Sequence, residues 1–233
     1  MDFVDQMLHD EAILSKYREI DKDNHTPSSH GMKHVAGVVV LADKLGKLFG
    51  FSERELMILK TIEILHDIGQ VGGVRKDHWF KSADFAREYL PPKNVFTDEE
   101  LEMIYSAIST HDEFLDYSKF ENKYSWFTAF IDKLDISKTR MEDGYEEKFG
   151  YINSSDIERL DFSIENGEFK IVIKTIKDPK VIAPENLYNR NLVCKTMTLF
   201  KGFSEHFGLI PRLFLENEEL DLDKFNRDAM VDR

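Results

Sequence analysis

The hydrophobic pattern along most of the chain has the period of α-helices separated by polar loops. Apolar residues recur at helical spacing within residues 2–20, which predicts an amphipathic helix. Residues 21–31 are polar and contain Pro27, so a loop is expected there. From residue 32 a second stripe runs through positions 34, 38, 41, 45 and 48. His34 is the first member of this stripe, and the helix therefore directs it inward.

Capping signals define the two following long helices. Ser52 followed by Glu55 predicts the start of a helix that is apolar on nearly every side and ends at His66 and Asp67. Gly69 then supplies a stop. A helix is expected from about residue 77 to residue 90, where two prolines break it.

The same reasoning applies further along the chain. Thr97 and Glu100 form a second capping box, which opens a helix that ends at His111 and Asp112. Residues 125–141 are strongly apolar and predict a helix that contains Asp132.

The pattern changes after residue 152. Residues 160–164 and 169–175 alternate between apolar and polar side chains, and the Asn-Gly pair between them predicts a β-hairpin. Residues 186–207 are again helical, and the acidic tail after Leu215 is either a short helix or frayed. The predicted fold is mostly α, a helical domain over residues 1–150 followed by an appendage over 151–233. The appendage consists of a small β-hairpin and a final long helix. We expect it either to pack on the helical domain or to form the interface of a homodimer.

Histidines and aspartates gather at the ends of the predicted helices. Five of the eight histidines lie at a helix start, a helix end or a neighbouring loop, and they are His30, His34, His66, His78 and His111. Burying polar groups without partners costs roughly 2–7 kcal/mol each. Either each histidine is satisfied separately as a structural residue, or a shared cation accounts for all of them. Mixed imidazole and carboxylate ligands suit transition metals better than Ca²⁺ or Mg²⁺.

These residues resemble the H…HD…D pattern of the HD-domain metal-dependent phosphohydrolase superfamily. His34, the pair His66-Asp67 within Ile-Leu-His-Asp-Ile-Gly, and Asp132 match its four ligand positions. His78 and His111 resemble the two additional histidines of the binuclear branch. The resemblance covers roughly residues 25–145 and implies an HD-domain helical bundle.

The resemblance implies two divalent transition metals, with Fe, Mn, Co, Ni and Zn as candidates. One would be held by His34, His66, Asp67 and Asp132, and Asp67 would bridge to a second held by His78 and His111. Two such ions, about 3.5–4 Å apart, clamp a phosphoryl group and generate a hydroxide nucleophile near neutral pH. The expected activity is hydrolysis of a phosphoester or phosphoanhydride in a small nucleotide-like substrate.

Further residues are candidates for substrate contact. Lys133 and Arg140 are seven residues apart on one predicted helix, where they would either grip a phosphate or form salt bridges. Arg75 and Lys76 precede His78 and would either meet substrate or stay solvated. His30 resembles a histidine found near the metals in some relatives, and is either a general acid or a solvated loop residue. Asp112 and Asp135 are candidates for orienting the ligand imidazoles from behind.

Several departures restrict the substrate. The Gly-Tyr-Pro signature of cyclic-di-GMP phosphodiesterases is absent, and Gln70 stands where that branch often has lysine. The second acidic pair of alarmone hydrolases is absent too. The chain thus resembles small bacterial stand-alone HD hydrolases. A symmetrical dinucleoside polyphosphate hydrolase is one alternative, and a metal-bearing module that senses a nucleotide or serves as a scaffold is another.

Composition limits the remaining possibilities. The net charge of −13 over 233 residues argues against general nucleic-acid binding and against an anionic membrane surface. One cysteine, Cys194, excludes an internal disulfide and is typical of a reducing compartment. No apolar run approaches the length of a membrane span. We therefore expect a soluble cytoplasmic protein.

Overall fold

The computed structural model describes residues 2–23, 30–73, 76–112, 116–136, 140, 156–176 and 191–225. The chain separates into two compact units, residues 1–132 and residues 133–233, which we call the first and second units. The predicted mostly α fold with a small C-terminal sheet is confirmed. The predicted domain boundary near residue 150 lies outside the described residues.

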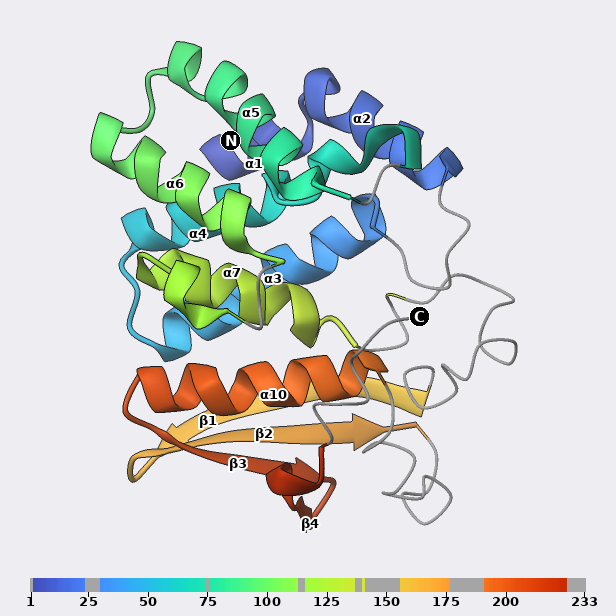
Figure 1. Cartoon of the computed structure of the whole chain (residues 1–233), viewed down its shortest axis with the longest axis vertical. Helices are drawn as coiled ribbons and strands as arrows, with labels where there is room; N and C mark the ends of the chain where they lie inside the picture. Colours follow the sequence, from blue (N-terminus) through green and yellow to red (C-terminus); the bar gives the residue numbers. More distant parts are fainter. Residues whose placement is uncertain are drawn as a thin grey trace. The chain divides into compact units, whose positions relative to one another are not determined.

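The first unit is helical (Figure 1). Its α-helices are α1 (Phe3–Leu8), α2 (Glu11–Asp23), α3 (Met32–Leu48), α4 (Glu53–Leu65), α5 (His78–Tyr89), α6 (Asp98–Thr110) and α7 (Lys123–Leu134), whose last two residues belong to the second unit. Short 3₁₀ helices connect them at η1 (Ile68–Gly73), η2 (Pro91–Lys93) and η3 (Tyr117–Lys119). No helix in the described ranges is both long enough and apolar enough to cross a membrane.

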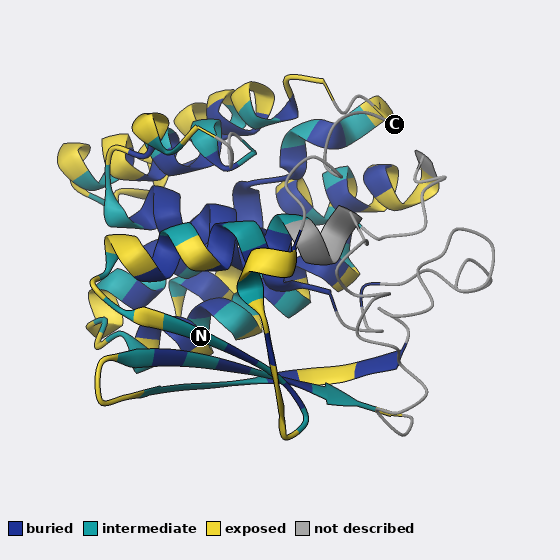
Figure 2. Ribbon diagram, turned by 60° about the horizontal axis from the view of Figure 1, so that its bottom comes forward, coloured by how far each residue is buried: buried dark blue, intermediate teal, exposed yellow. Residues whose placement is uncertain are grey.

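Helix α4 is the central element of the first unit. Ser52 and Glu55 form the predicted capping box, and the side chains of α4 from Leu56 onward are mostly buried, because α1, α3, α5 and α6 all pack against it. Figure 2 shows the corresponding concentration of buried residues inside the helical unit. The second predicted capping box, Thr97 with Glu100, is also present and opens α6. These local signals place the starts of α4 and α6 where the sequence predicts them.

Two predicted helix boundaries are wrong. The expected helix over residues 2–20 is broken at His9, because Asp10 accepts a hydrogen bond from the Ala12 amide (2.9 Å) and starts a new helix. Helix α7 ends at Leu134 rather than near residue 141, because the Ile136 amide turns back to donate to the Leu134 carbonyl (2.8 Å).

The second unit contains a four-stranded sheet in the order β1-β2-β3-β4. Its strands are β1 (Ile157–Glu165), β2 (Glu168–Thr175), β3 (Ile210–Leu215) and β4 (Glu218–Leu220). β1 and β2 form the predicted antiparallel hairpin, in which Asn166 and Gly167 both have positive φ angles (53° and 79°). Left-handed backbone at both positions is the geometry that the Asn-Gly pair favours.

Helix α10 (Asn191–His206) covers one face of this sheet (Figure 1). The Phe169 ring of β2 lies 5.2 Å from Phe200 and 6.1 Å from Phe203 of α10, measured between ring centroids. Residues 186–190 of the predicted helix lie outside the described residues.

The sequence did not predict β3 or β4. β3 pairs in parallel with β2 across the intervening helix, so no local turn signals it. The tail after Leu215 does contain the expected short helix, η6 (Leu222–Lys224), but strand β4 precedes it.

Candidate metal centre

The end of α4 places His66 and Asp67 in the interior of the first unit. His66 is the C-terminal cap of α4, and the chain continues directly into η1 at Ile68. Gly69 permits a close approach of α5, because a β-carbon there would lie 2.3 Å from the His78 carbonyl oxygen and 2.7 Å from the Ser82 amide nitrogen. The Gly69 amide also donates to the Ser82 hydroxyl (2.9 Å). A residue without a side chain thus brings the start of α5, with His78, close to Asp67.

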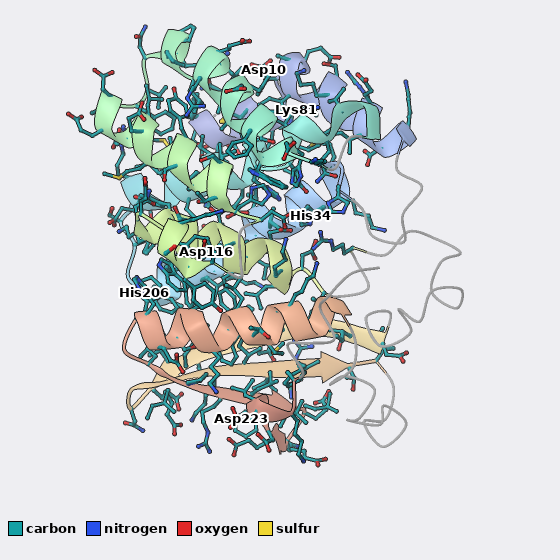
Figure 3. All side chains as sticks on the ribbon, viewed as in Figure 1. Asp10, His34, Lys81, Asp116, His206 and Asp223 are labelled. Carbon is teal, nitrogen blue, oxygen red and sulfur yellow. The ribbon has the colours of Figure 1, made fainter. Side chains whose placement is uncertain are left out.

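One group of ligand atoms gathers on one side of Asp67. His34 Nε2 lies 3.3 Å from His66 Nε2 and 3.3 Å from Asp132 Oδ1. Asp67 Oδ2 faces the same group, 3.5 Å from His66 Nε2 and 3.9 Å from His34 Nε2. The group joins α3, the end of α4 and α7, and all four side chains are buried. In Figure 3 the labelled His34 lies among the dense side chains of the helical unit.

A second group lies at the other carboxylate oxygen. Asp67 Oδ1 is 3.0 Å from His78 Nε2 and 3.6 Å from His111 Nε2, and the two imidazole nitrogens are 3.2 Å apart. The ring centroids of His66 and His111 are 5.1 Å apart, so the two groups of ligand atoms are adjacent. Within the described residues, His34, His66 and Asp132 form one set of donors close enough to hold a metal ion, and His66, Asp67 and His111 form another.

The histidine tautomers are set by backbone carbonyls. His66 Nδ1 lies 2.9 Å from the Glu63 carbonyl oxygen, and His111 Nδ1 lies 2.7 Å from the Ile108 carbonyl oxygen. A carbonyl oxygen only accepts, so each Nδ1 carries the hydrogen and each neutral ring keeps its lone pair on Nε2. This arrangement is usual for metal-ligating histidines, and it directs both lone pairs toward Asp67.

The charges of the cluster are strongly coupled. Burial opposes protonation of His66, but the Asp67 and Asp132 carboxylates outweigh it and raise the pKa of His66 to about 10. Burial likewise opposes ionisation of Asp67, yet the charge of His66 and the close contacts with the surrounding histidines hold its pKa well below the ordinary value. Burial lowers the pKa of His111, so this imidazole is neutral and available as a donor. Positive charge is therefore stabilised at His66, between the two carboxylates.

His30 also contacts Asp67. Its Nδ1 lies 2.9 Å from Asp67 Oδ2, and the Gln70 amide nitrogen lies 3.3 Å from the same ring nitrogen. The His30 side chain is 19% exposed, against 2% for Asp67, so it occupies the more solvent-accessible side of the carboxylate. The structure brings this predicted catalytic candidate to the cluster.

Sequence reasoning missed two polar residues behind the ligands. Glu63 is one turn before His66, Thr128 is one turn before Asp132, and both are fully buried. Burial raises the pKa of Glu63 well above the ordinary value; His66 opposes the rise and Asp132 adds to it. Thr128 acts in the opposite direction and lowers the pKa of Glu63. Within the described part of the chain, neither carboxyl oxygen of Glu63 has a hydrogen-bond partner. The sequence does signal Glu63, because it is an acidic residue within the apolar stretch at the end of α4.

Three of the remaining candidates lie in the loops and segments that follow the helices of this cluster. Lys76 is exposed, Arg75 lies outside the described residues, and Asp112 is half-buried directly after His111.

Lys133, Asp135 and Arg140 belong to the second unit. All three are buried, and Arg140 Nη1 donates to the Asp135 carbonyl oxygen at 3.4 Å. The prediction that Lys133 and Arg140 share one helix face is wrong, because α7 ends at Leu134 before it reaches Arg140.

A scan of the chain against protein-family models and a search of curated proteins both find no match. The structural findings are therefore those of a helical unit whose buried histidine and aspartate groups can hold a metal ion. This arrangement is compatible with an HD-type domain.

Proposed function

We propose that the protein is a metal-dependent phosphohydrolase of the HD type, acting on a phosphoester or phosphoanhydride of a nucleotide-like substrate. The observation that carries the proposal is the position of Asp67 between two histidine groups. Oδ1 lies 3.0 Å from His78 Nε2, and Oδ2 lies 3.5 Å from His66 Nε2. A carboxylate with a separate set of nitrogen donors at each oxygen suits a bridge between two cations.

The chemistry of the donors fits divalent transition metals. His34, His66, Asp132 and Asp67 Oδ2 would hold one ion, and His78, His111 and Asp67 Oδ1 would hold the other. The ligands are imidazoles and carboxylates without a thiolate, which suits Mn, Fe, Co, Ni or Zn. When bound, two such ions stabilise developing charge on phosphoryl oxygens and lower the pKa of water. Two dications also exceed the charge of the two carboxylates, which makes a local site for an anion in an acidic protein.

The side chains around Asp67 have distinct roles in the proposed reaction. Asp67 would hold the two ligand groups next to each other. The carbonyls of Glu63 and Ile108 keep His66 and His111 in the tautomer that leaves the Nε2 lone pair free to bind a metal ion. In this reaction a water molecule would release a proton to solvent and attack phosphorus, the bond from phosphorus to the leaving oxygen would break, and His30 would donate a proton to that oxygen. The partial exposure of His30 on the Oδ2 side of Asp67 supports this role.

The proposal is tested by a hydrolysis screen on the full-length protein. Nucleotides, cyclic nucleotides and dinucleoside polyphosphates are supplied with Mn, Fe(II), Co or Ni in turn, and products are separated by chromatography. We expect turnover that requires added metal. His30→Gln is expected to lower kcat by roughly 10²–10⁴-fold while metal content is retained, because it removes a proton donor but no proposed ligand.

Two outcomes would contradict the proposal. Turnover that persists in a metal-free His66→Ala/Asp67→Ala double variant would remove the metal centre from the reaction. Stoichiometric metal and tight nucleotide binding without turnover of any substrate would favour the sensing or scaffold module instead. Symmetric cleavage of a dinucleoside tetraphosphate into two nucleoside diphosphates would assign the narrower substrate class.

A further inference from the structure

Tyr17 contacts the end of α4 from a helix outside the segment that resembles HD domains. It lies on α2, is fully buried, and its hydroxyl donates to the Ile64 carbonyl oxygen at 2.6 Å across 47 residues of sequence. Ile64 is two residues before His66. Helix α2 also packs against η1, the segment that follows Asp67.

The Ile64 carbonyl requires a partner that α4 itself does not supply. The last four carbonyls of an α-helix lack intrahelical donors, and α4 ends at Leu65 before the chain tightens into η1. The Tyr17 hydroxyl therefore caps the helix beside the His66-Asp67 pair. A directed bond of this kind limits the position of the backbone that carries both side chains.

The pKa of the buried Tyr17 phenol also responds to the charge of Asp67. Burial raises the pKa of Tyr17 well above the ordinary value, and the Asp67 charge is the next contribution. The contact that fixes the hydroxyl is its bond to the Ile64 carbonyl oxygen, two residues before His66.

Apolar packing alone does not require this hydroxyl. Ile13 and Ile20 lie on the same stripe of α2 and are buried, so they anchor the helix without it. Phenylalanine at position 17 would fill the same space. The hydroxyl instead adds a directional hydrogen bond to the apolar packing of α2.

We propose that Tyr17 is a positioning residue, whose bond to Ile64 sets the end of α4 so that the two oxygens of Asp67 face both histidine groups. This inference rests on the metal centre of the proposed function. It extends the functional unit beyond the resembling segment to α2.

The test compares Tyr17→Phe with the matched variant Tyr89→Phe. Tyr89 on α5 donates its hydroxyl to Asp10 Oδ2 at 2.7 Å, so this control also removes one hydroxyl and one hydrogen bond within the first unit. Mn²⁺ affinity is measured by calorimetry on the full chain, and the visible absorption spectrum is recorded with Co²⁺ at saturation. We expect Tyr17→Phe to bind Mn²⁺ roughly 10- to 100-fold more weakly and to alter the Co²⁺ spectrum. Tyr89→Phe is expected to match the wild type in both.

The Co²⁺ spectrum separates positioning from general destabilisation, because it reports ligand geometry after every folded molecule is loaded. Wild-type Mn²⁺ affinity and an unchanged Co²⁺ spectrum in Tyr17→Phe would overturn the inference, as would equal effects of the two variants. Metal binding without hydrolysis by the wild type would contradict the proposed function but leave this comparison decisive. Absence of metal binding by the wild type would overturn both proposals.

Discussion

One cluster in the first unit and the sheet of the second unit treat charged and polar side chains in opposite ways. In the first unit, His34, His66, Asp67, His78, His111 and Asp132, which we call the ligand cluster, are buried and aim donor atoms at one another. In the second unit, the sheet carries exposed or half-buried ion pairs. Lys174 Nζ lies 3.0 Å from Glu216 Oε2, and Arg212 Nη2 donates to Glu219 Oε2 at 2.9 Å.

The difference distinguishes buried polar groups that could hold a metal ion from ion pairs that are complete without one. Each cation of the sheet pairs lies next to a carboxylate and near water, so the pairs are complete and contribute little energy. The ligand cluster contains two carboxylates and several lone-pair donors but no Lys or Arg among its members. Buried charges of that kind are normally paired or coordinate a metal. The burial of the cluster, together with its composition, makes it a candidate site for a metal ion.

The largest expected effect is at Asp67. Asp67→Asn keeps the size of the side chain but removes its charge and one acceptor oxygen, so it should disrupt both ligand groups. We expect metal affinity to fall by at least about 100-fold, beyond the 10–100-fold typical of residues behind the ligands. The measurement is metal content after dialysis at a fixed free Mn²⁺ concentration. The control is Asp161→Asn on β1, which removes only the exposed pair with Arg159 (3.1 Å). Equal metal content in both variants would contradict the distinction between the two units.

Two glycines provide the next comparison. A β-carbon at Gly69 would meet backbone atoms of α5 at 2.3 and 2.7 Å, so Gly69→Ala should displace His78 from Asp67 and cost about 1–3 kcal/mol of stability. Gly167 has a φ of 79° with nothing within 4 Å of a β-carbon, so Gly167→Ala should cost about 1–2 kcal/mol of strain. Thermal unfolding and Mn²⁺ titration are measured for both. We expect both to be destabilised and only Gly69→Ala to lose metal affinity, roughly tenfold or more. Unchanged metal affinity in Gly69→Ala would show that α5 is not positioned through this contact.

Metal affinity should also depend on pH. The pKa of His66 is about 10, so at neutral pH an entering metal ion must displace a proton from this imidazole. The apparent affinity should therefore rise about tenfold per pH unit between pH 6 and pH 9, and fall as the pH is lowered. Calorimetry in buffers of different ionisation enthalpy measures the proton release directly. Affinity that is flat over this range would contradict the charge arrangement of the cluster.

The smallest effect is expected on the sheet. Arg212→Gln removes the exposed pair with Glu219 and keeps most of the aliphatic stem. The free energy of unfolding should change by less than about 1 kcal/mol, because exposed ion pairs contribute roughly 0.2–1 kcal/mol. Urea denaturation measures the change, and Mn²⁺ affinity should stay at the wild-type value. A loss comparable to that of Gly69→Ala would show that the sheet pairs are more than surface interactions.

The sequence by itself determined the features that depend on neighbouring residues. The capping boxes at Ser52 and Thr97, the Asn166-Gly167 turn and the apolar character of α4 were all predicted and are all present. Each is controlled by side chains and backbone within about one helical turn or one hairpin. Four of the six predicted ligand residues occupy such local features: His66 and Asp67 after α4, His111 after α6 and His78 at the start of α5.

Tertiary structure decided the features that join distant segments. The parallel pairing of β3 with β2, the contact of His30 with Asp67 and the bond from Tyr17 to Ile64 all cross long stretches of chain. The end of α7 at Leu134 likewise separated Lys133 from Arg140, which a continued helix would have aligned. Local sequence patterns specify which groups are polar and which turn comes next. Whether a buried carboxylate such as Asp67 has one neighbour or five depends on how the helices pack, because the chain must fold before those groups meet.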